Sequence, residues 1–370
     1  MNRQSNKRII ISGGGTGGHI FPAISIANAL MRMDPGAEIL FVGAEGRMEM
    51  EKVPAAGYKI IGLPVAGFYR SLTPKNFIVL YKLVKSMFLA RKLIKEFNPD
   101  VVVGVGGYAS GPVLRKAGRM GIPTLIQEQN SYAGITNKLL AKKASVICVA
   151  YDGMEKYFPA EKLIKTGNPV RHNFDNLESL SDEADTFFNV DKNKPVILVL
   201  GGSLGAGTIN KSLSGNIERM KESGYQWLWQ TGKLYYENVN ALVNISGGDT
   251  IIVYDFINRM DYAFAAADII VSRAGAGTIS ELCLVGKPVI LVPSPNVAED
   301  HQTRNAQALY QRNAAVIVTD DDAVEYLMDE IVKLVADKIR RSALSMNIKT
   351  MADSDADIRI AREILKLAGK

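Results

Sequence analysis

Residues that could bind an anion and move a proton stand together near the N-terminus, in the segment Ser12-Gly-Gly-Gly-Thr-Gly-Gly-His19. Its glycines expose a row of backbone N–H groups to an anion, because no Cβ holds the anion away. At a helix N-terminus the His19 imidazole is favoured in the neutral form that a general base requires. The segment therefore predicts a base beside an anion site, with simple capping or packing by His19 as the alternative.

The same segment matches the G-x-G-x-x-G pattern of dinucleotide-binding proteins at Gly13, Gly15 and Gly18. That function also needs an acidic residue where the second strand ends. Glu38 begins that strand and Glu45 lies beyond its end, so neither residue meets the requirement. A dinucleotide-binding protein stays open as the alternative from a different functional class.

A second glycine-rich segment, Gly104-Val-Gly-Gly-Tyr108, also follows an expected strand and leads into a helix. Two such loops on neighbouring strands could hold a diphosphate jointly, although each could equally be a tight turn. Further on, Gln127-Glu-Gln-Asn130 ends another strand. We expect Glu128 and Asn130 to face the same ligand-binding edge of the sheet.

The second half of the chain carries a third segment of this kind, Ser272-Arg-Ala-Gly-Ala-Gly-Thr-Ile-Ser-Glu281, with a helix expected from about Gly277. Its N–H groups and the Thr278 hydroxyl could receive a phosphate. Glu281 could accept hydrogen bonds from both hydroxyls of a ribose, or it could form a capping box with Thr278 instead. The glycine loop at residues 201–207, which contains Ser203, is the expected partner for the same phosphates.

The hydrophobic pattern predicts a scaffold that brings these strand ends together. Short β-branched runs alternate with helical patterns, which indicates parallel sheets with right-handed crossovers. The pattern restarts after an acidic, polar stretch, so we expect two doubly wound domains with ligands in a cleft between them. The first domain is expected at residues 1–166, and a C-terminal helix at 356–370 is expected to complete it. The linker is expected at 167–194 and the second domain at 195–355.

Individual elements can be placed from the same pattern. In the first half, strands are expected at residues 8–12, 38–43, 100–105, 124–127, 145–149 and 163–166, and helices at 23–33, 75–97, 111–119 and 134–142. In the second half, strands are expected at residues 195–200, 226–230, 250–254, 268–272, 288–292 and 315–318.

The composition is that of a globular protein of 370 residues, with 47% hydrophobic residues and a net charge of +6. This modest positive charge fits an anionic substrate or membrane surface and does not by itself indicate nucleic acid. Cys148 and Cys283 lie far apart, so we expect no disulfide, no metal site and a reducing cytoplasm. The polar N-terminus predicts no signal peptide, and no apolar run is long enough to span a bilayer.

Six motifs occur in a fixed order: Gly-Gly-Thr-Gly-Gly-His-Ile-Phe-Pro (14–22), Gly-Val-Gly-Gly-Tyr (104–108), Glu-Gln-Asn (128–130), Gly-Asn-Pro-Val-Arg (167–171), Gly-Gly-Ser-Leu-Gly (201–205) and Gly-Thr-Ile-Ser-Glu (277–281). Through them the chain resembles the MurG family, the peptidoglycan N-acetylglucosaminyltransferases of glycosyltransferase family 28, over nearly its whole length. The resemblance implies the GT-B fold, in which two Rossmann-like domains face each other across a cleft.

The resemblance also implies an activity. Such an enzyme transfers N-acetylglucosamine from UDP-N-acetylglucosamine to the muramyl 4-hydroxyl of undecaprenyl-diphosphoryl-muramyl-pentapeptide (lipid I), giving lipid II with inversion. It implies no cofactor, a peripheral location on the cytoplasmic face of the bacterial inner membrane, and other cell-wall synthesis proteins as candidate partners, but no nucleic acid. A related GT-B transferase with a UDP-sugar and another lipid acceptor is the alternative within the enzyme class.

Residue roles follow from the resemblance position by position. Arg171 and Ser203 would hold the donor diphosphate, the Ile257 backbone would contact uracil, Glu281 the ribose and Gln302 the sugar. His19 would be the general base. Donor contacts are further expected from Thr16, Gly17, Gly18, Asn130, Gly277 and Thr278, and acceptor diphosphate contacts from Gly14, Gly15, Gly106, Gly107, Tyr108 and Glu128. The family often carries Ala-Leu-Thr and Gln-Gln where this chain has Ala276-Gly-Thr278 and His301-Gln302.

Residues 74–95 mix large apolar side chains with six cationic ones and no acidic one. An ordinary amphipathic helix with a basic outer face would show this pattern. A peripheral surface that binds anionic lipid would show it too, and one long helix can do both. The expected membrane-facing residues are Phe77, Tyr81, Lys82, Lys85 and Phe88.

Overall fold

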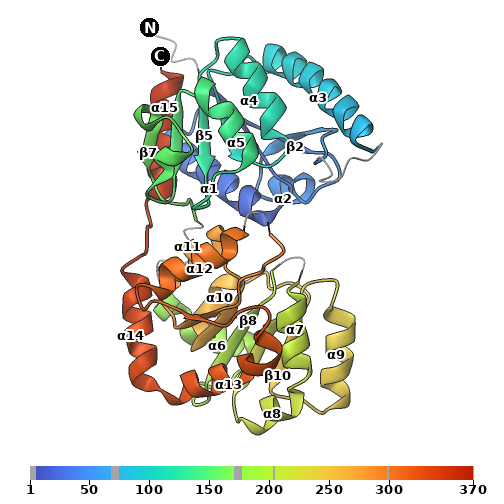
Figure 1. The fold of residues 1–370 in the computed structure, drawn as a ribbon, viewed down its shortest axis with the longest axis vertical. Coiled ribbons are helices and arrows are strands. Elements are labelled where there is room, and N and C mark those ends of the chain that lie inside the picture. Colours follow the sequence, from blue (N-terminus) through green and yellow to red (C-terminus); the bar gives the residue numbers. More distant parts are fainter. Residues whose placement is uncertain (1–5, 68–74, 171–176, 203–204, 298–299, 370) are drawn as a thin grey trace. The chain divides into compact units, whose positions relative to one another are not determined.

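The computed structural model describes residues 6–67, 75–170, 177–202, 205–297 and 300–369, which form two compact units. The first unit contains Met1–Arg171 and Ser354–Lys370, and the second contains His172–Asp353. Each unit is a parallel sheet with helices on both faces (Figure 1). The predicted α/β class with two doubly wound parallel sheets is therefore confirmed.

The sheet of the first unit has the strand order β3-β2-β1-β4-β5-β6-β7. The order reverses between β1 and β4, and in such sheets ligands bind where the strand order reverses. Both glycine loops of the first half follow these two strands. The strands are β1 (Arg8–Gly13), β2 (Glu38–Ala44), β3 (Lys59–Leu63), β4 (Val101–Gly106), β5 (Thr124–Glu128), β6 (Val146–Val149) and β7 (Leu163–Lys165).

Alternating side chains of the central strands bury both faces of this sheet. Ile9 and Ile11 of β1 pack with one core cluster, and Ile10 packs with the cluster on the opposite face. Helices α1 and α15 cover the first face, while α3 and α4 cover the second. The helices are α1 (Gly17–Met33), α2 (Glu49–Ala55), α3 (Lys75–Phe97), α4 (Ser110–Arg119), α5 (Ile135–Leu140) and α15 (Ala356–Ala368).

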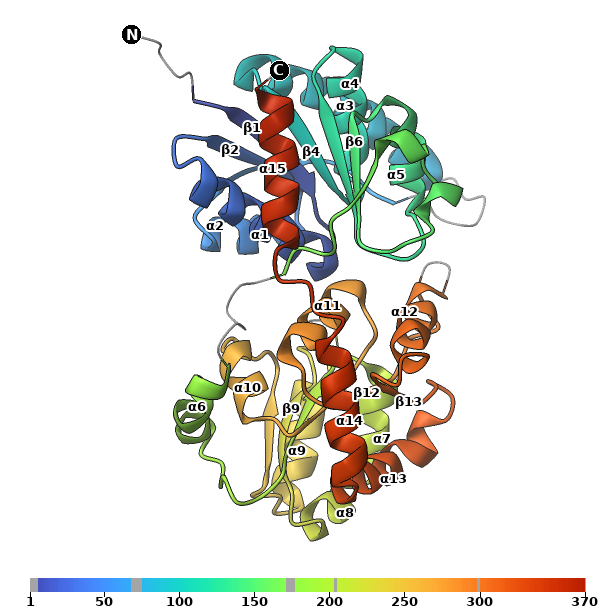
Figure 2. The same ribbon diagram turned by 90° about the vertical axis from the view of Figure 1, so that its left-hand side faces the viewer.

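The C-terminal helix α15 lies across the sheet of the first unit and packs on α1 (Figure 2). Asp357, only 1% exposed, accepts a hydrogen bond from Arg32 of α1 at 2.7 Å. Arg359 donates to the Thr166 carbonyl oxygen at 2.7 and 3.1 Å. These contacts fix α15 to both α1 and the end of β7, although the chain passes through the second unit before reaching this helix.

The sheet of the second unit has the order β10-β9-β8-β11-β12-β13 and repeats the reversal at β8 and β11. Its strands are β8 (Val196–Leu200), β9 (Gln226–Gln230), β10 (Ile251–Tyr254), β11 (Ile269–Ser272), β12 (Val289–Leu291) and β13 (Val316–Ile317). Its helices are α6 (Ser181–Phe188), α7 (Gly207–Ser214), α8 (Ile217–Glu222), α9 (Tyr236–Ile245), α10 (Met260–Ala266), α11 (Ala276–Val285), α12 (His301–Tyr310), α13 (Ala323–Ala336) and α14 (Lys338–Lys349).

The acidic stretch that we expected to be a solvated linker is partly folded. A 3₁₀ turn at Leu177–Leu180 leads into α6, which packs against α10 of the second unit. Ala184 and Phe188 of α6 are buried in the core. Asp182 and Glu183 of α6 are exposed and Asp185 is half-buried, so the acidic composition did not prevent a helix that packs through Ala184 and Phe188.

Candidate active site

The two glycine loops of the first unit lie against each other at the ends of β1 and β4. These strands pair in parallel, with Gly13 opposite Gly106. A Cβ on Gly107 would collide with the Gly14 carbonyl oxygen, and Gly107 has a positive φ of 83°. The backbone is therefore so close here that only glycine fits at Gly107.

His19 is the third residue of α1, which begins earlier than the sequence predicted, and its ring is half-buried. Its Nδ1 lies 3.2 Å from the Gly14 carbonyl oxygen and 3.3 Å from Thr16 Oγ1. A carbonyl oxygen can only accept, so the contact with Gly14 is a hydrogen bond when Nδ1 carries the hydrogen, and Nε2 of a neutral ring then holds the lone pair. This tautomer is the one that a base acting through Nε2 requires.

The His19 ring also lies against Gly106 of the second loop. A Cβ on Gly106 would stand 2.6 Å from His19 Cδ2 and 2.8 Å from Nε2, and Gly106 has a φ of 104°. The two loops therefore lie together as expected: Gly106 lies against the His19 ring, and Gly107 lies against Gly14 of the turn before α1. Tyr108, which follows them, is 58% exposed.

Residues 16–18 form the start of α1. Thr16 is its N-cap, but its side chain makes no capping hydrogen bond. The N–H groups of Gly17 and Gly18 have no acceptor within the helix, because the first turn of any α-helix leaves its donors unpaired. These N–H groups, next to His19, are suited to an anionic or hydroxyl-bearing ligand.

A buried carboxylate that sequence reasoning missed supports the same turn. Glu49, the first residue of α2, is 1% exposed. Its Oε2 accepts from the Gly15 N–H at 2.9 Å, and its Oε1 accepts from the Ala44 N–H at 2.8 Å. The Gly15 donor is therefore occupied, which shortens the row of N–H groups that we expected an anion to meet.

Glu128 does not extend toward a ligand. It is 2% exposed, and its Oε2 accepts from the Gly134 N–H and from Asn137 Nδ2, both at 2.9 Å. Its Oε1 accepts from the N–H and the side-chain amide of Asn130 at 3.1 and 3.3 Å. These contacts argue against the predicted role of Glu128 on the acceptor diphosphate, which its charge would also repel. Glu128 instead shapes the loop that presents the half-buried Asn130.

The third glycine segment begins α11 at Ala276, with Gly275 as the N-cap. Thr278 is therefore inside the helix, and the alternative capping box between Thr278 and Glu281 is wrong, because such a box needs Thr278 at the N-cap. Gly277 has open space around the place of a Cβ, so it does not need to be glycine for steric reasons. Thr278 and Glu281 lie half-buried in the first turns of α11.

A network behind this segment joins it to the glycine loop that precedes α7. Arg273 pairs with Asp320, and it also donates to the Val292 carbonyl oxygen at 3.0 Å. The second oxygen of Asp320 accepts from the Thr208 hydroxyl of α7 at 2.8 Å. Arg273 and Asp320 are each 17% exposed, so water screens this pair only in part.

We expect Asp320→Asn to weaken donor binding and leave the rate at saturating donor nearly unchanged. The substitution leaves the mostly buried Arg273 without its counter-ion, which costs about 2 kcal/mol in stability. Urea unfolding and UDP titration measure both effects, with the exposed neighbour Asp321→Asn as the matched control. Equal UDP affinity in the two variants would contradict a role of the network in shaping the donor loops.

Two expected donor contacts are restricted by their own hydrogen bonds. Gln302 Oε1 accepts from the N–H groups of Ser294 and Ala274 at 2.9 and 3.3 Å, which leaves the amide NH₂ for the expected sugar contact. The Ile257 N–H donates to Gln230 Oε1 at 2.9 Å, so its carbonyl oxygen is the backbone group left for uracil. Arg171 and Ser203 lie outside the described residues.

The basic, apolar helix α3 has the predicted bounds and two different faces. Val79, Ala90, Leu93 and Ile94 pack into the core. On the outer face, Phe77, Tyr81 and Phe88 are 77%, 67% and 68% exposed, with Lys85 exposed and Lys82 half-buried among them. Within the described part of the chain, no helix is long and apolar enough to cross a membrane.

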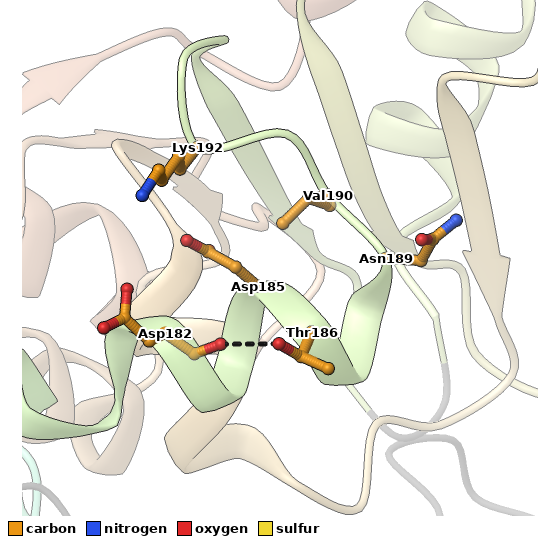
Figure 3. Close-up of a pocket in the computed structure, with 6 residues that line it drawn as sticks. All are labelled: Asp182, Asp185, Thr186, Asn189, Val190 and Lys192. Carbon is orange, nitrogen blue, oxygen red and sulfur yellow. Dashed lines mark hydrogen bonds between the residues drawn. The ribbon is translucent and has the colours of Figure 1, made fainter.

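A surface hollow of about 390 Å³ is formed by residues between 182 and 192, a segment that contains none of the site residues described above (Figure 3). It is lined by residues of α6 and the turn after it, where the Thr186 hydroxyl donates to the Asp182 carbonyl oxygen at 2.9 Å. It contains none of the predicted site residues, so we do not assign it to the active site.

Both halves of the chain match domains of one protein family. Residues 9–149 match the glycosyltransferase family 28 N-terminal domain, and residues 196–360 match the glycosyltransferase family 28 C-terminal domain. The chain is 59% identical to a protein of Parabacteroides distasonis, and the match covers 98% of this chain and 99% of the relative. It is 60% identical to a protein of Phocaeicola vulgatus, where the match covers 99% of this chain and 98% of the relative. Both are named UDP-N-acetylglucosamine--N-acetylmuramyl-(pentapeptide) pyrophosphoryl-undecaprenol N-acetylglucosamine transferase.

A solved structure agrees with these relatives. The crystal structure of Acinetobacter baumannii MurG is 28% identical, covers 97% of this chain and 99% of its own, and superimposes with a TM-score of 0.75. The predicted GT-B class of the two sheets is thus confirmed.

Proposed function

Because this chain belongs to glycosyltransferase family 28, we propose that it transfers N-acetylglucosamine from UDP-N-acetylglucosamine to the muramyl 4-hydroxyl of lipid I, which gives lipid II. The observation that carries the proposal is the 59% identity to a transferase of that name over 98% of the chain. The arrangement of the first unit supports it, because the His19 imidazole lies beside two glycine loops.

The proposed reaction is a single displacement at the anomeric carbon. His19 Nε2 takes the proton of the acceptor hydroxyl as its oxygen bonds to the sugar, while the bond from the sugar to the UDP oxygen breaks on the opposite face. One base is enough for inversion, because no sugar–enzyme bond has to form. The N–H groups that start α11 are suited to the negative charge that the leaving diphosphate gains.

Roles in donor and acceptor binding extend the proposal. Glu281 binds the ribose hydroxyls, Thr278 the diphosphate, and the Gln302 amide the sugar, all from the second unit. Thr16, Gly17, Gly18 and Asn130 of the first unit reach the donor sugar, with Arg171 and Ser203 as diphosphate ligands. Gly14, Gly106, Gly107 and Tyr108 form the acceptor side around His19.

Transfer of labelled N-acetylglucosamine from its UDP donor to a lipid I analogue tests the function directly. We expect saturable transfer that a chelator does not change, because the helix N-termini supply the charge stabilisation. No transfer would contradict the proposal, and loss of transfer with chelator would contradict its metal-free chemistry. Saturable binding of NAD without binding of UDP would favour a dinucleotide-binding protein instead.

We further propose that the exposed face of α3 binds the anionic cytoplasmic leaflet of the inner membrane. Phe77, Tyr81 and Phe88 recur at helical spacing, so they form one stripe along the helix. Apolar rings that enter the lipid headgroup region, flanked by cations, are typical of peripheral membrane binding. Such a contact would bring the enzyme to an acceptor whose undecaprenyl chain stays in the bilayer.

Reversing the charges of Lys82 and Lys85, which flank this stripe, is expected to weaken vesicle binding. Each cation near an anionic surface contributes about 1 kcal/mol, so Lys82→Glu with Lys85→Glu should weaken binding roughly 30-fold or more. Co-sedimentation with vesicles that contain anionic lipid measures the change. Lys192→Glu with Lys194→Glu, two exposed lysines of the second unit, changes the net charge equally. Equal binding of both double variants would contradict the membrane role of α3.

A further inference from the structure

Glu49 is a buried carboxylate for which the proposed chemistry has no direct use. It starts α2, after the strand β2, and it is 1% exposed. Both of its oxygens accept from backbone N–H groups, one on Gly15 and one on Ala44. Burying a carboxylate costs free energy unless hydrogen bonds compensate it, so a buried glutamate that holds both the end of β2 and the turn before α1 has a positional role.

Two glycines make room for this carboxylate. A Cβ on Gly14 would collide with the Glu49 carboxyl group, and a Cβ on Gly43 would stand 2.5 Å from Glu49 Cγ. The side chain therefore fills a space between the end of β2 and the turn before α1. This turn cannot shift toward β2 without displacing the carboxylate.

The contact with Gly15 acts on the same peptide group that orients His19. The Gly15 N–H and the Gly14 C=O belong to one peptide bond, and a trans peptide is planar with these two groups on opposite edges. Glu49 Oε2 accepts from the N–H edge at 2.9 Å, and His19 Nδ1 lies 3.2 Å from the oxygen on the carbonyl edge, where it can donate. The carboxylate thus fixes the plane of this peptide and strengthens its carbonyl as an acceptor, since successive hydrogen bonds polarise one another.

We propose that Glu49 is a positioning residue for the base: through the Gly14–Gly15 peptide it keeps His19 in the Nδ1–H tautomer, with Nε2 ready to accept the acceptor's proton. This inference rests on the proposed function for its catalytic consequence, but the tautomer itself is a property of the protein without substrate. A purely structural role of Glu49 would change stability and leave the tautomer unchanged.

The test compares Glu49→Gln and Glu49→Ala with Glu51→Gln, a matched control on the same helix whose side chain is 74% exposed. Glutamine has nearly the same shape, but its NH₂ must face one of the two N–H groups and loses that bond. We expect kcat to fall roughly 10- to 100-fold in Glu49→Gln, because small displacements of a catalytic group cost that much. KM for UDP-N-acetylglucosamine should stay unchanged, and Glu51→Gln should behave as wild type.

The second readout is the ¹⁵N spectrum of the histidine rings, which distinguishes the two neutral tautomers. The chain has three histidines, so the His19 signals are identified by their loss in His19→Ala. We expect the Nδ1–H form in the wild type and a mixture with the Nε2–H form in Glu49→Gln. An Nε2–H wild type, or an unchanged tautomer and kcat in Glu49→Gln, would overturn the proposal.

The two readouts separate this inference from the proposed function. If the wild type transfers no sugar, the proposed function fails, while the tautomer comparison still tests Glu49. If Glu49→Ala does not fold, Glu49→Gln carries the comparison, with UDP binding as the check that the second unit is intact. The wild-type tautomer is measured in any case and can overturn the proposal alone.

Discussion

His19→Ala is expected to lower kcat roughly 100- to 10,000-fold, the range that a positioned general base contributes, and to leave affinity for UDP nearly unchanged. The loss follows because the ring that the Gly14 carbonyl orients, with its lone pair on Nε2, is the proposed proton acceptor. Affinity for UDP is kept because the proposed uracil and ribose ligands, Ile257 and Glu281, belong to the other compact unit.

The pH dependence of the same variant sharpens this test. A base must be deprotonated to act, so wild-type kcat/KM should fall at low pH. The His19→Ala variant should lack this acidic limb. Steady-state kinetics over a pH series, with UDP titration by calorimetry, measures both effects. If UDP affinity collapses while turnover is spared, His19 is a binding residue and not the base.

Gly106→Ala is expected to have the second-largest effect, although it adds only one methyl group. The new Cβ would stand 2.6 Å from His19 Cδ2 and 2.8 Å from Nε2, so the ring must move. The φ of 104° at this position is also unfavourable for any L side chain, with a cost on the order of 1–3 kcal/mol. We expect kcat to fall roughly 100-fold or more, because a misplacement of about 1 Å has that effect.

A Gly→Ala substitution elsewhere in the same unit shows whether the loss of kcat comes from the collision with His19 or from replacing any glycine. Gly118 lies in α4 of the same unit, where a Cβ would meet only ordinary contact at 3.7 Å. Gly118→Ala should therefore keep wild-type kcat and gain slightly in helix stability. Kinetics and thermal unfolding of both variants provide the comparison. Wild-type kcat in Gly106→Ala would show that the His19 ring is not held where the structure places it.

The elements that the sequence predicted well are those with strong periodic patterns. The buried central strands read as continuous apolar runs, and the long helix α3 was predicted with its observed bounds. Strand β3, which we did not predict, lies at a sheet edge and pairs only with β2. Its residues alternate in exposure and include Gly62, so the run is neither continuously apolar nor rich enough in β-branched residues to stand out.

The start of α1 was also predicted too late, and this error concerns the site. Glycines lower helix propensity, so the sequence pattern placed the helix start at residue 23, whereas α1 begins at Gly17. The tertiary contact of the loop overrides that propensity, since the Gly15 N–H and the His19 ring are both held by hydrogen bonds. As a result His19 is a helical residue with a fixed ring and not part of a mobile turn.

Hydrogen-bond partners within the site could not be predicted from sequence spacing. Nothing in the local pattern distinguishes the buried Glu49 from its neighbours Glu45 and Glu51, because its burial depends on the space beside Gly14 and Gly43. Likewise, the sequence suggested Glu128 as a ligand contact, whereas in the structure its carboxylate accepts hydrogen bonds from N–H groups of its own loop. The motifs predicted which loops form the candidate site. The packing of those loops determines which of their polar atoms are still able to contact a substrate.

The most direct test of the central claim is the structure of the disaccharide product. The account predicts a single displacement by the muramyl 4-hydroxyl, with one base and no sugar–enzyme intermediate. NMR of the product made from the α-linked UDP donor and a lipid I analogue should then show one new β linkage to the 4-oxygen of the muramyl ring. An α linkage, a bond to another hydroxyl, or free N-acetylglucosamine as the only product would contradict it.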